Sequence, residues 1–132
     1  MNNHLQKTIS DPISLQGVGL HSGKQCNLTI YPGIDDQGIV FKRVDLKKNN
    51  LVEANFKNVS SAKLCTTLQN NHGVKVSTVE HLLAALYISE IDNAIIELDN
   101  EEVPIMDGSA KNFLEALKKT KIKSLSKKRN YI

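Results

Sequence analysis

The chain has 132 residues, enough for one domain with its own hydrophobic core, and 40% of them are hydrophobic. No apolar run is long enough to cross a bilayer, the N-terminal stretch MNNHLQKTIS lacks the apolar block of a secretory signal, and Cys26 and Cys65 form neither a disulfide framework nor a C-x-x-C site. Together with a formal net charge of +3, these features argue against a membrane-spanning or disulfide-stapled protein and predict a cytoplasmic one with reduced thiols.

Alternation of polar and apolar residues predicts strands in the first half of the chain. Residues 5–20 favour two short strands separated at Asp11-Pro12. Residues 25–31 alternate cleanly, and residues 38–46 form a further predicted strand. Joined by turns, these strands predict an antiparallel meander with one buried face.

Residues 74–88, VKVSTVEHLLAALYI, predict a helix that is buried on two sides. Ser77 or Thr78 can cap its start, and Ser77-x-x-Glu80 fits a capping box in which Glu80 reaches back to the first backbone amide. One apolar face follows the helical spacing and comprises Val79, Leu82, Leu83, Leu86 and Tyr87. The opposite side is also apolar apart from a histidine and comprises His81, Ala84, Ala85 and Ile88. A second surface is therefore expected to pack there.

A strand over residues 93–98 and a second helix complete the predicted fold. Ser109 is a good cap for this helix. Its single apolar face comprises Ala110, Phe113, Leu114 and Leu117. Several strands followed by two helices predict an α+β fold in which both helices cover one face of a mainly antiparallel sheet.

Basic residues are concentrated at the C-terminal end. Residues 1–117 contain ten basic and fourteen acidic residues, a net charge of −4, whereas residues 118–132 carry seven basic residues and no acidic one. We therefore predict a folded domain over residues 1–117 and a solvated basic tail or truncated linker over residues 118–132. No aromatic residue is interleaved with the lysines, so nucleic-acid binding is not expected.

Glu80 and His81 are adjacent polar residues in the first helix, and the residues alone leave two interpretations open. In the structural one, His81 is a hydrogen-bonded core or interface histidine and Glu80 belongs to the capping box. In the catalytic one, His81 binds a metal ion and Glu80 takes a proton from the metal-bound water. The motif is not H-E-x-x-H, because no second histidine follows four residues later, so the local signal is weak.

Three polar or glycine-rich stretches are not required by the strand and helix patterns, namely GVGLHSGK (17–24), STVEHLLAAL (77–86) and PIMDGSA (104–110). With KLCTTL and IDNAIIEL, they occur in the order and spacing of one family. From about Gln6 to Leu117 the chain resembles the N-terminal domain of the UDP-3-O-acyl-N-acetylglucosamine deacetylases, zinc enzymes of lipid A biosynthesis in Gram-negative bacteria. The resemblance favours the catalytic interpretation of Glu80 and His81.

The resemblance implies specific roles for these residues. His81 is expected to be a zinc ligand, and Glu80 is expected to be the general base as hydroxide attacks the acetamide carbonyl. Zinc would lower the pKa of its bound water towards ~7. The expected substrate is a UDP-linked acylated glucosamine. The residues expected to line the pocket or to support the site are His21, Leu64, Cys65 and Asp107.

By the same resemblance, the family fold has two α+β domains with their helices between the two sheets and the active site between the domains. The second domain supplies the other zinc ligands, a histidine and an aspartate in H-x-x-x-D spacing, and a catalytic histidine. This sequence offers one ligand by resemblance, His81, where a catalytic zinc needs three protein ligands. We therefore expect the chain to be inactive alone.

Three explanations remain open for a chain of this kind. It is the first domain of a longer or split enzyme, a truncated gene product, or a non-catalytic interaction domain whose basic tail is its contact surface. In the first case its partner is a second deacetylase domain. Without that domain the apolar helix side is exposed, and self-association through it is expected.

Overall fold

The computed structural model describes residues 4–61 and 65–129. Within these ranges the elements are β1 Leu5–Ile9, β2 Ile13–Val18, β3 Gln25–Pro32, β4 Ile39–Arg43, β5 Leu51–Glu53, a 3-10 turn Phe56–Asn58, β6 Val59–Ser61, β7 Thr67–Gln69, β8 Lys75–Ser77, α1 Glu80–Ile88, β9 Ala94–Leu98, α2 Lys111–Leu117 and β10 Ile122–Lys128. No helix in the described ranges has the length and apolar character needed to cross a lipid bilayer.

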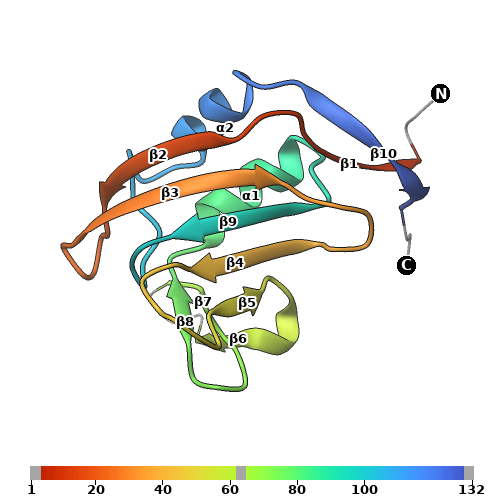
Figure 1. The fold of residues 1–132 in the computed structure, drawn as a ribbon. Helices are drawn as coiled ribbons and strands as arrows, with labels where there is room; N and C mark the ends of the chain where they lie inside the picture. Colours follow the sequence, from red (N-terminus) through yellow and green to blue (C-terminus); the bar gives the residue numbers. More distant parts are fainter. Residues whose placement is uncertain (1–3, 62–64, 130–132) are drawn as a thin grey trace.

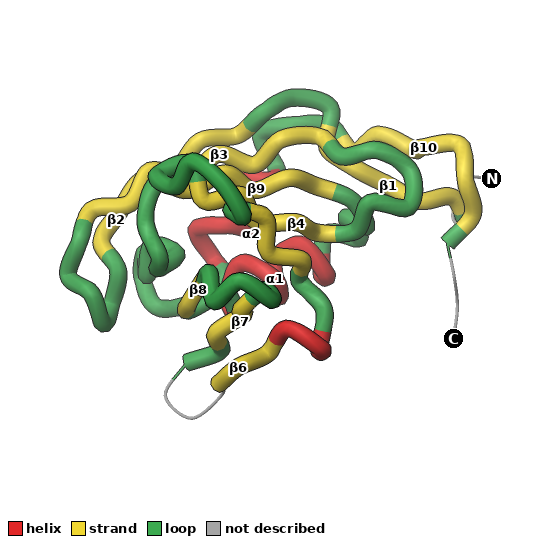
Figure 2. The backbone as a smooth tube through the Cα atoms, turned by 60° about the horizontal axis from the view of Figure 1, so that its bottom comes forward, coloured by secondary structure: helices red, strands yellow, loops and turns green. Residues whose placement is uncertain are grey.

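The largest layer is a five-stranded sheet in the order β2-β3-β9-β4-β5 (Figure 1). Its neighbouring strands are antiparallel except β4 and β9, which run parallel with Val40 opposite Ile95. The connection from β4 to β9 contains α1, because a parallel pair needs a long crossover. Both helices lie on the same face of the sheet (Figure 1, Figure 2). The predicted α+β fold is confirmed.

The hydrophobic core lies between this sheet and the two helices. The sheet contributes alternate residues of its central strands, Cys26, Leu28 and Ile30 from β3 and Ala94, Ile96 and Leu98 from β9. The helices contribute Leu82, Ala85 and Leu86 from α1 and Phe113, Ala116 and Leu117 from α2. Full burial of a large apolar side chain stabilises the fold by about 1.5–3 kcal/mol relative to exposure. These contacts hold α1 against the sheet.

The start of α1 differs from the prediction. Its N-cap is Val79, with no side-chain cap hydrogen bond, and Ser77 belongs to β8. The predicted capping box is wrong, because Glu80 Oε1 accepts a hydrogen bond from the Thr66 amide at 3.3 Å. Thr78 adopts a left-handed backbone conformation, with φ at 62°, that turns the chain from β8 into the helix.

The faces of α1 are also rotated relative to the prediction. Ala85, predicted on the outer side, is buried, whereas Tyr87, predicted in the core, is 85% exposed. A small side chain lets the helix approach the sheet closely, and a tyrosine in that position would need a buried partner for its hydroxyl. Ala84, Tyr87 and Ile88 form an exposed apolar stripe, called here the outer stripe of α1.

The basic C-terminal segment contains a strand that the sequence analysis did not predict. β10 pairs antiparallel with β1, with Ile9 opposite Ile122 and Leu5 opposite Lys128. Only Leu125 of β10 is partly buried and the rest is exposed. The strand therefore lacks the alternation of buried and exposed residues from which a strand is predicted. The domain boundary at residue 117 stays a prediction, but the structure orders residues 122–128 against β1.

Candidate functional site

Three segments from distant parts of the sequence meet where β2 ends. They are the loop between β2 and β3, the segment that follows β9, and the turn before α1. Ile105 N–H donates to Val18 O at 2.9 Å, and Val103 N–H donates to Ser77 O at 3.0 Å. Parts of the stretches GVGLHSGK, STVEHLLAAL and PIMDGSA are therefore joined in space at this point, called here the junction.

Glu102 lies at the centre of the junction. The residue is 3% exposed. Its carboxylate accepts hydrogen bonds from the Thr78 hydroxyl at 2.6 Å, from the Ser22 amide at 2.8 Å, and from the His21 amide at 3.0 and 3.1 Å to its two oxygens. Burial by itself raises the pKa of Glu102, but these donors outweigh it and hold the pKa below its usual value. The carboxylate is therefore ionised at neutral pH.

Glu80 and His81 occupy the first turn of α1, directly after the junction, and both are partly buried. The Thr78 and Val79 amides donate to Thr66 O at 2.9 and 3.4 Å. In return, the Thr66 amide donates to Glu80 Oε1. These reciprocal bonds fix where α1 begins, and so where the two side chains leave the backbone.

Cys65 lies near the same turn and is partly buried. Its Sγ is 3.7 Å from Thr67 Oγ1, and the Thr67 hydroxyl donates to Ser77 Oγ at 3.2 Å. The Thr67 side chain thus connects Cys65 to Ser77 at the end of β8. Leu64, its expected neighbour in the pocket, lies outside the described residues. The pocket role of both residues stays a prediction.

His21 and Asp107 lie in different parts of the structure. The His21 backbone is held on Glu102 at the junction, and the residue is exposed. Asp107 is exposed just before α2, where its Oδ1 accepts the Ser109 hydroxyl at 2.8 Å and the Ser109 amide at 3.1 Å. The Ser109 hydroxyl is the main cause that lowers the pKa of Asp107. These bonds assign Asp107 to the turn before α2, and its supporting role in the site stays a prediction.

The two thiols are expected to differ sharply in reactivity. Burial, followed by the charge of Asp99, raises the pKa of the Cys26 thiol to about 11. At pH 8 roughly one Cys26 in 10³ is then a reactive thiolate. A disulfide reagent added to the folded chain should label Cys65 and spare Cys26, as mass spectrometry of the digest would report. Equal labelling of both thiols in folded protein would contradict this assignment.

A catalytic zinc site normally takes three protein ligands. Across residues 4–61 and 65–129, no group of three or more His, Cys, Asp or Glu side chains is placed to hold a metal ion. The imidazole of His81 is a suitable zinc ligand by its chemistry, but the described residues do not complete a donor set around it. By itself, this part of the chain does not fit a whole catalytic zinc site.

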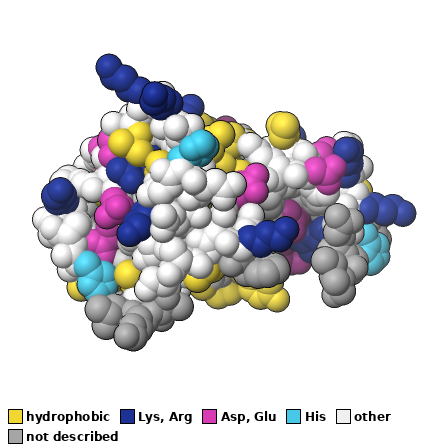
Figure 3. Space-filling model, turned by 90° about the horizontal axis from the view of Figure 1, so that it is seen from below, with side chains coloured by type: hydrophobic (Ala, Val, Ile, Leu, Met, Phe, Trp, Pro, Cys, Tyr) yellow, Lys and Arg dark blue, Asp and Glu magenta, His cyan; other side chains and the backbone are white. Residues whose placement is uncertain are grey.

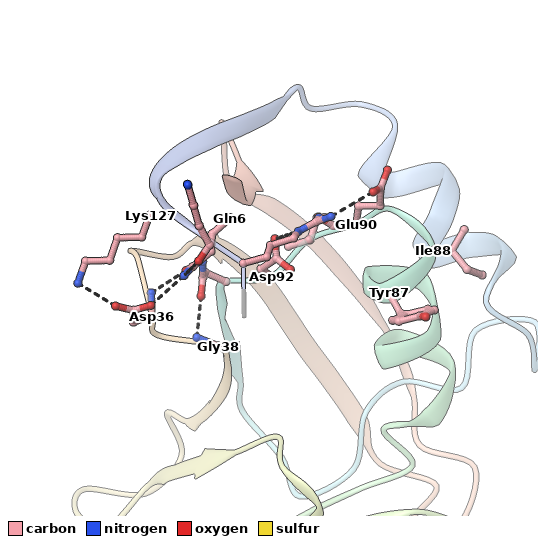
Figure 4. Close-up of a pocket in the computed structure, with 12 residues that line it drawn as sticks. Gln6, Asp36, Gly38, Tyr87, Ile88, Glu90, Asp92 and Lys127 are labelled. Atoms are coloured by element: carbon pink, nitrogen blue, oxygen red, sulfur yellow. Dashed lines mark hydrogen bonds and ion pairs between the residues drawn. The ribbon is translucent and has the colours of Figure 1, made fainter. Parts of the chain in front are cut away.

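A large cavity lies at the other end of α1. It has a volume of about 1120 Å³ and opens between the end of α1, β1 and β10 (Figure 4). On one side Lys127 pairs with Asp36 at 2.8 Å, and on the other Tyr87 and Ile88 form an apolar wall. Of the residues predicted for the site, the five that the structure describes do not line this cavity, so it is separate from the junction.

A sheet covered on one face by two helices is the arrangement that the resemblance implies for one deacetylase domain. A family model described as UDP-3-O-acyl N-acetylglycosamine deacetylase matches residues 6–132. The chain belongs to this family.

Curated relatives agree with the family match. The chain is 46% identical over 127 residues to the UDP-3-O-acyl-N-acetylglucosamine deacetylase of Geotalea uraniireducens (strain Rf4), 46% to that of Blochmanniella floridana, and 43% to that of Vibrio cholerae. Each match covers 96% of this chain but only 41%, 43% and 42% of those proteins, respectively. The chain therefore spans about two fifths of the length of the curated relatives it matches.

Proposed function

We propose that the chain supplies the N-terminal part of a cytoplasmic, zinc-dependent deacetylase that hydrolyses the N-acetyl group of UDP-3-O-acyl-N-acetylglucosamine in lipid A biosynthesis. In this proposal His81 is one zinc ligand and Glu80 is the general base. The observation that carries it is the position of this pair, which begins α1 at the junction. Membership of the deacetylase family supports the reaction.

Residues of this chain have the following roles in the proposed reaction. When bound, zinc supplies a water of lowered pKa and polarises the acetamide carbonyl. The Glu80 carboxylate, oriented by the Thr66 amide, takes the proton of the attacking water. A protonated group then donates a proton to the glucosamine nitrogen, which leaves. The proposal keeps Leu64 and Cys65 in the pocket wall and His21 and Asp107 in supporting positions.

A second deacetylase domain completes the zinc site, and we place it against the outer stripe of α1. Tyr87 and Ile88 are 85% and 61% exposed. Figure 3 shows hydrophobic side chains along the lower margin of that view. Apolar surface of this kind marks protein–protein contacts. When the second domain is absent, two copies of the chain are expected to pair through the outer stripe. Sedimentation at rising concentration measures this, and a monomer throughout would refute the pairing.

Zinc binding tests the proposal on the chain itself. The purified chain should bind zinc much more weakly than a complete three-ligand site, and His81→Ala should remove that binding. His72→Ala is the matched control, because His72 is an exposed imidazole away from the junction and its loss should change nothing. Tight binding of one zinc per chain, or binding that survives His81→Ala, would overturn the assignment.

The reaction itself can be measured in a chimera. In this fusion protein, the present chain replaces the 127 matched residues of the Geotalea uraniireducens relative, so that the rest of that relative completes the site. The unmodified relative is the positive control for the assay. The fusion protein is called the chimera below.

A further inference from the structure

We propose that Glu102 is a positioning residue of the deacetylase site, which fixes the His21 loop relative to the first turn of α1. This inference rests on the proposed function, since it matters for catalysis only if Glu80, His81 and His21 serve the reaction. Glu102 was not among the site residues predicted from the sequence. Its role follows from three features of the junction.

The first feature is the convergence of donors on one buried carboxylate. Two consecutive amides of the loop, those of His21 and Ser22, donate to Glu102 from one side, and the Thr78 hydroxyl donates from the other. An ionised carboxylate only accepts hydrogen bonds and has room for all of them. A glutamine in its place would present an amide NH₂ to at least one of these donors. The site is therefore built for a carboxylate.

The second feature is the strained turn that precedes α1. Thr78 is held at φ 62°, a conformation that β-branched residues rarely adopt. Its amide donates to Thr66 O and its hydroxyl to Glu102 Oε2, and these two bonds hold the turn. The turn directs Glu80 and His81, two and three residues further on. Glu102 thus acts on α1 through Thr78.

The third feature is the close approach of the loop to the carboxylate. A Cβ atom built on Gly19 would run into Glu102 Oε1 and Ser22 Oγ. Glycine at this position therefore lets the loop close over Glu102. The backbone of the 101–103 segment is itself fixed, because Ser77 N–H donates to Glu101 O at 2.8 Å and Val103 N–H donates to Ser77 O. The carboxylate has little freedom to follow a displaced loop.

Residue-level amide exchange of the full 132-residue chain tests the positioning directly. In Glu102→Gln, the His21 and Ser22 amides should exchange at least about tenfold faster than in the wild type, while amides of β3 and β9 keep their rates. Glu101→Gln is the matched control, because Glu101 is the exposed neighbour, and it should leave the loop amides unchanged. Unchanged His21 and Ser22 rates, or an equal acceleration throughout the sheet, would overturn the proposal.

Thr78→Val keeps the inference testable if Glu102→Gln does not fold. Valine has nearly the same shape as threonine but lacks the hydroxyl that donates to Glu102. The amides of Thr66 and Val79, which hold the start of α1, should exchange faster in this variant, while the Ser22 amide stays protected by the carboxylate. Wild-type rates at Thr66 and Val79 would refute the link from Glu102 to α1.

The chimera separates this inference from the proposed function. There, Glu102→Gln should lower kcat at least about tenfold with zinc content and KM nearly unchanged, as expected for misplaced groups that still bind substrate. An unchanged kcat would overturn the catalytic part of the inference. An inactive wild-type chimera would refute the proposed function and, with it, the catalytic part of this inference. The amide-exchange result would then still decide whether Glu102 holds the loop.

Discussion

Replacing Glu80 by Gln is expected to lower kcat of the chimera by about 10²- to 10⁴-fold, the usual contribution of a general base. The amide keeps the size of the side chain and can still accept the Thr66 hydrogen bond, but it cannot take a proton from water. Zinc content should stay close to that of the unsubstituted chimera, because the proposed ligands, His81 and those of the second domain, are intact. Acetate release under saturating substrate measures the effect.

Glu115→Gln is the matched control, since Glu115 is an exposed carboxylate on α2. Its activity should equal that of the unsubstituted chimera. If Glu80→Gln retained more than half of the activity at full zinc content, Glu80 would not be the base. If the variant lost zinc as well as activity, the carboxylate would be acting on the metal site instead.

Leu82→Ala is expected to lower the free energy of unfolding of the chain by about 3 kcal/mol, within the range seen for buried leucines. Leu82 is fully buried on the sheet side of α1, so its truncation leaves a cavity beneath the turn that carries Glu80 and His81. Urea denaturation followed by far-ultraviolet circular dichroism measures the loss.

Tyr87→Ala is the control on the same helix. Because Tyr87 is 85% exposed, its truncation should change the free energy of unfolding of the monomer by less than about 0.5 kcal/mol. The sequence pattern places both residues on the buried face, so the comparison also tests the helix orientation. Equal losses in the two variants would mean that Tyr87 is buried after all.

Most of the individual strands and helices followed from local patterns. The predicted antiparallel meander is wrong, because β9 lies between β3 and β4 in the sheet and β1 pairs with β10 instead. The break at Asp11-Pro12, the alternation in β3 and the strand at β9 each carry a strong signal, and each appears in the structure. The start of α1 did not follow, because Thr78 adopts a left-handed conformation supported by Thr66 and Glu102, both distant in sequence. β10 did not follow either, because its order comes from pairing with β1.

The candidate site was only partly predictable. Glu80, His81 and His21 were identified from family stretches, and the structure brings the His21 backbone and the first turn of α1 to one junction. The sequence does not single out Glu102, because it does not reveal that a carboxylate is buried. Its position just before the apolar stretch Val103-Pro104-Ile105 was the available signal.

The central claim is that this chain provides the base and one zinc ligand of a deacetylase whose site a second domain completes. Acetate release from UDP-3-O-acyl-N-acetylglucosamine, measured side by side for the zinc-loaded chain and the chimera, tests it most directly. The account predicts turnover by the chimera and none by the chain alone. Robust turnover by the pure chain, or a folded and zinc-loaded chimera without activity, would contradict it.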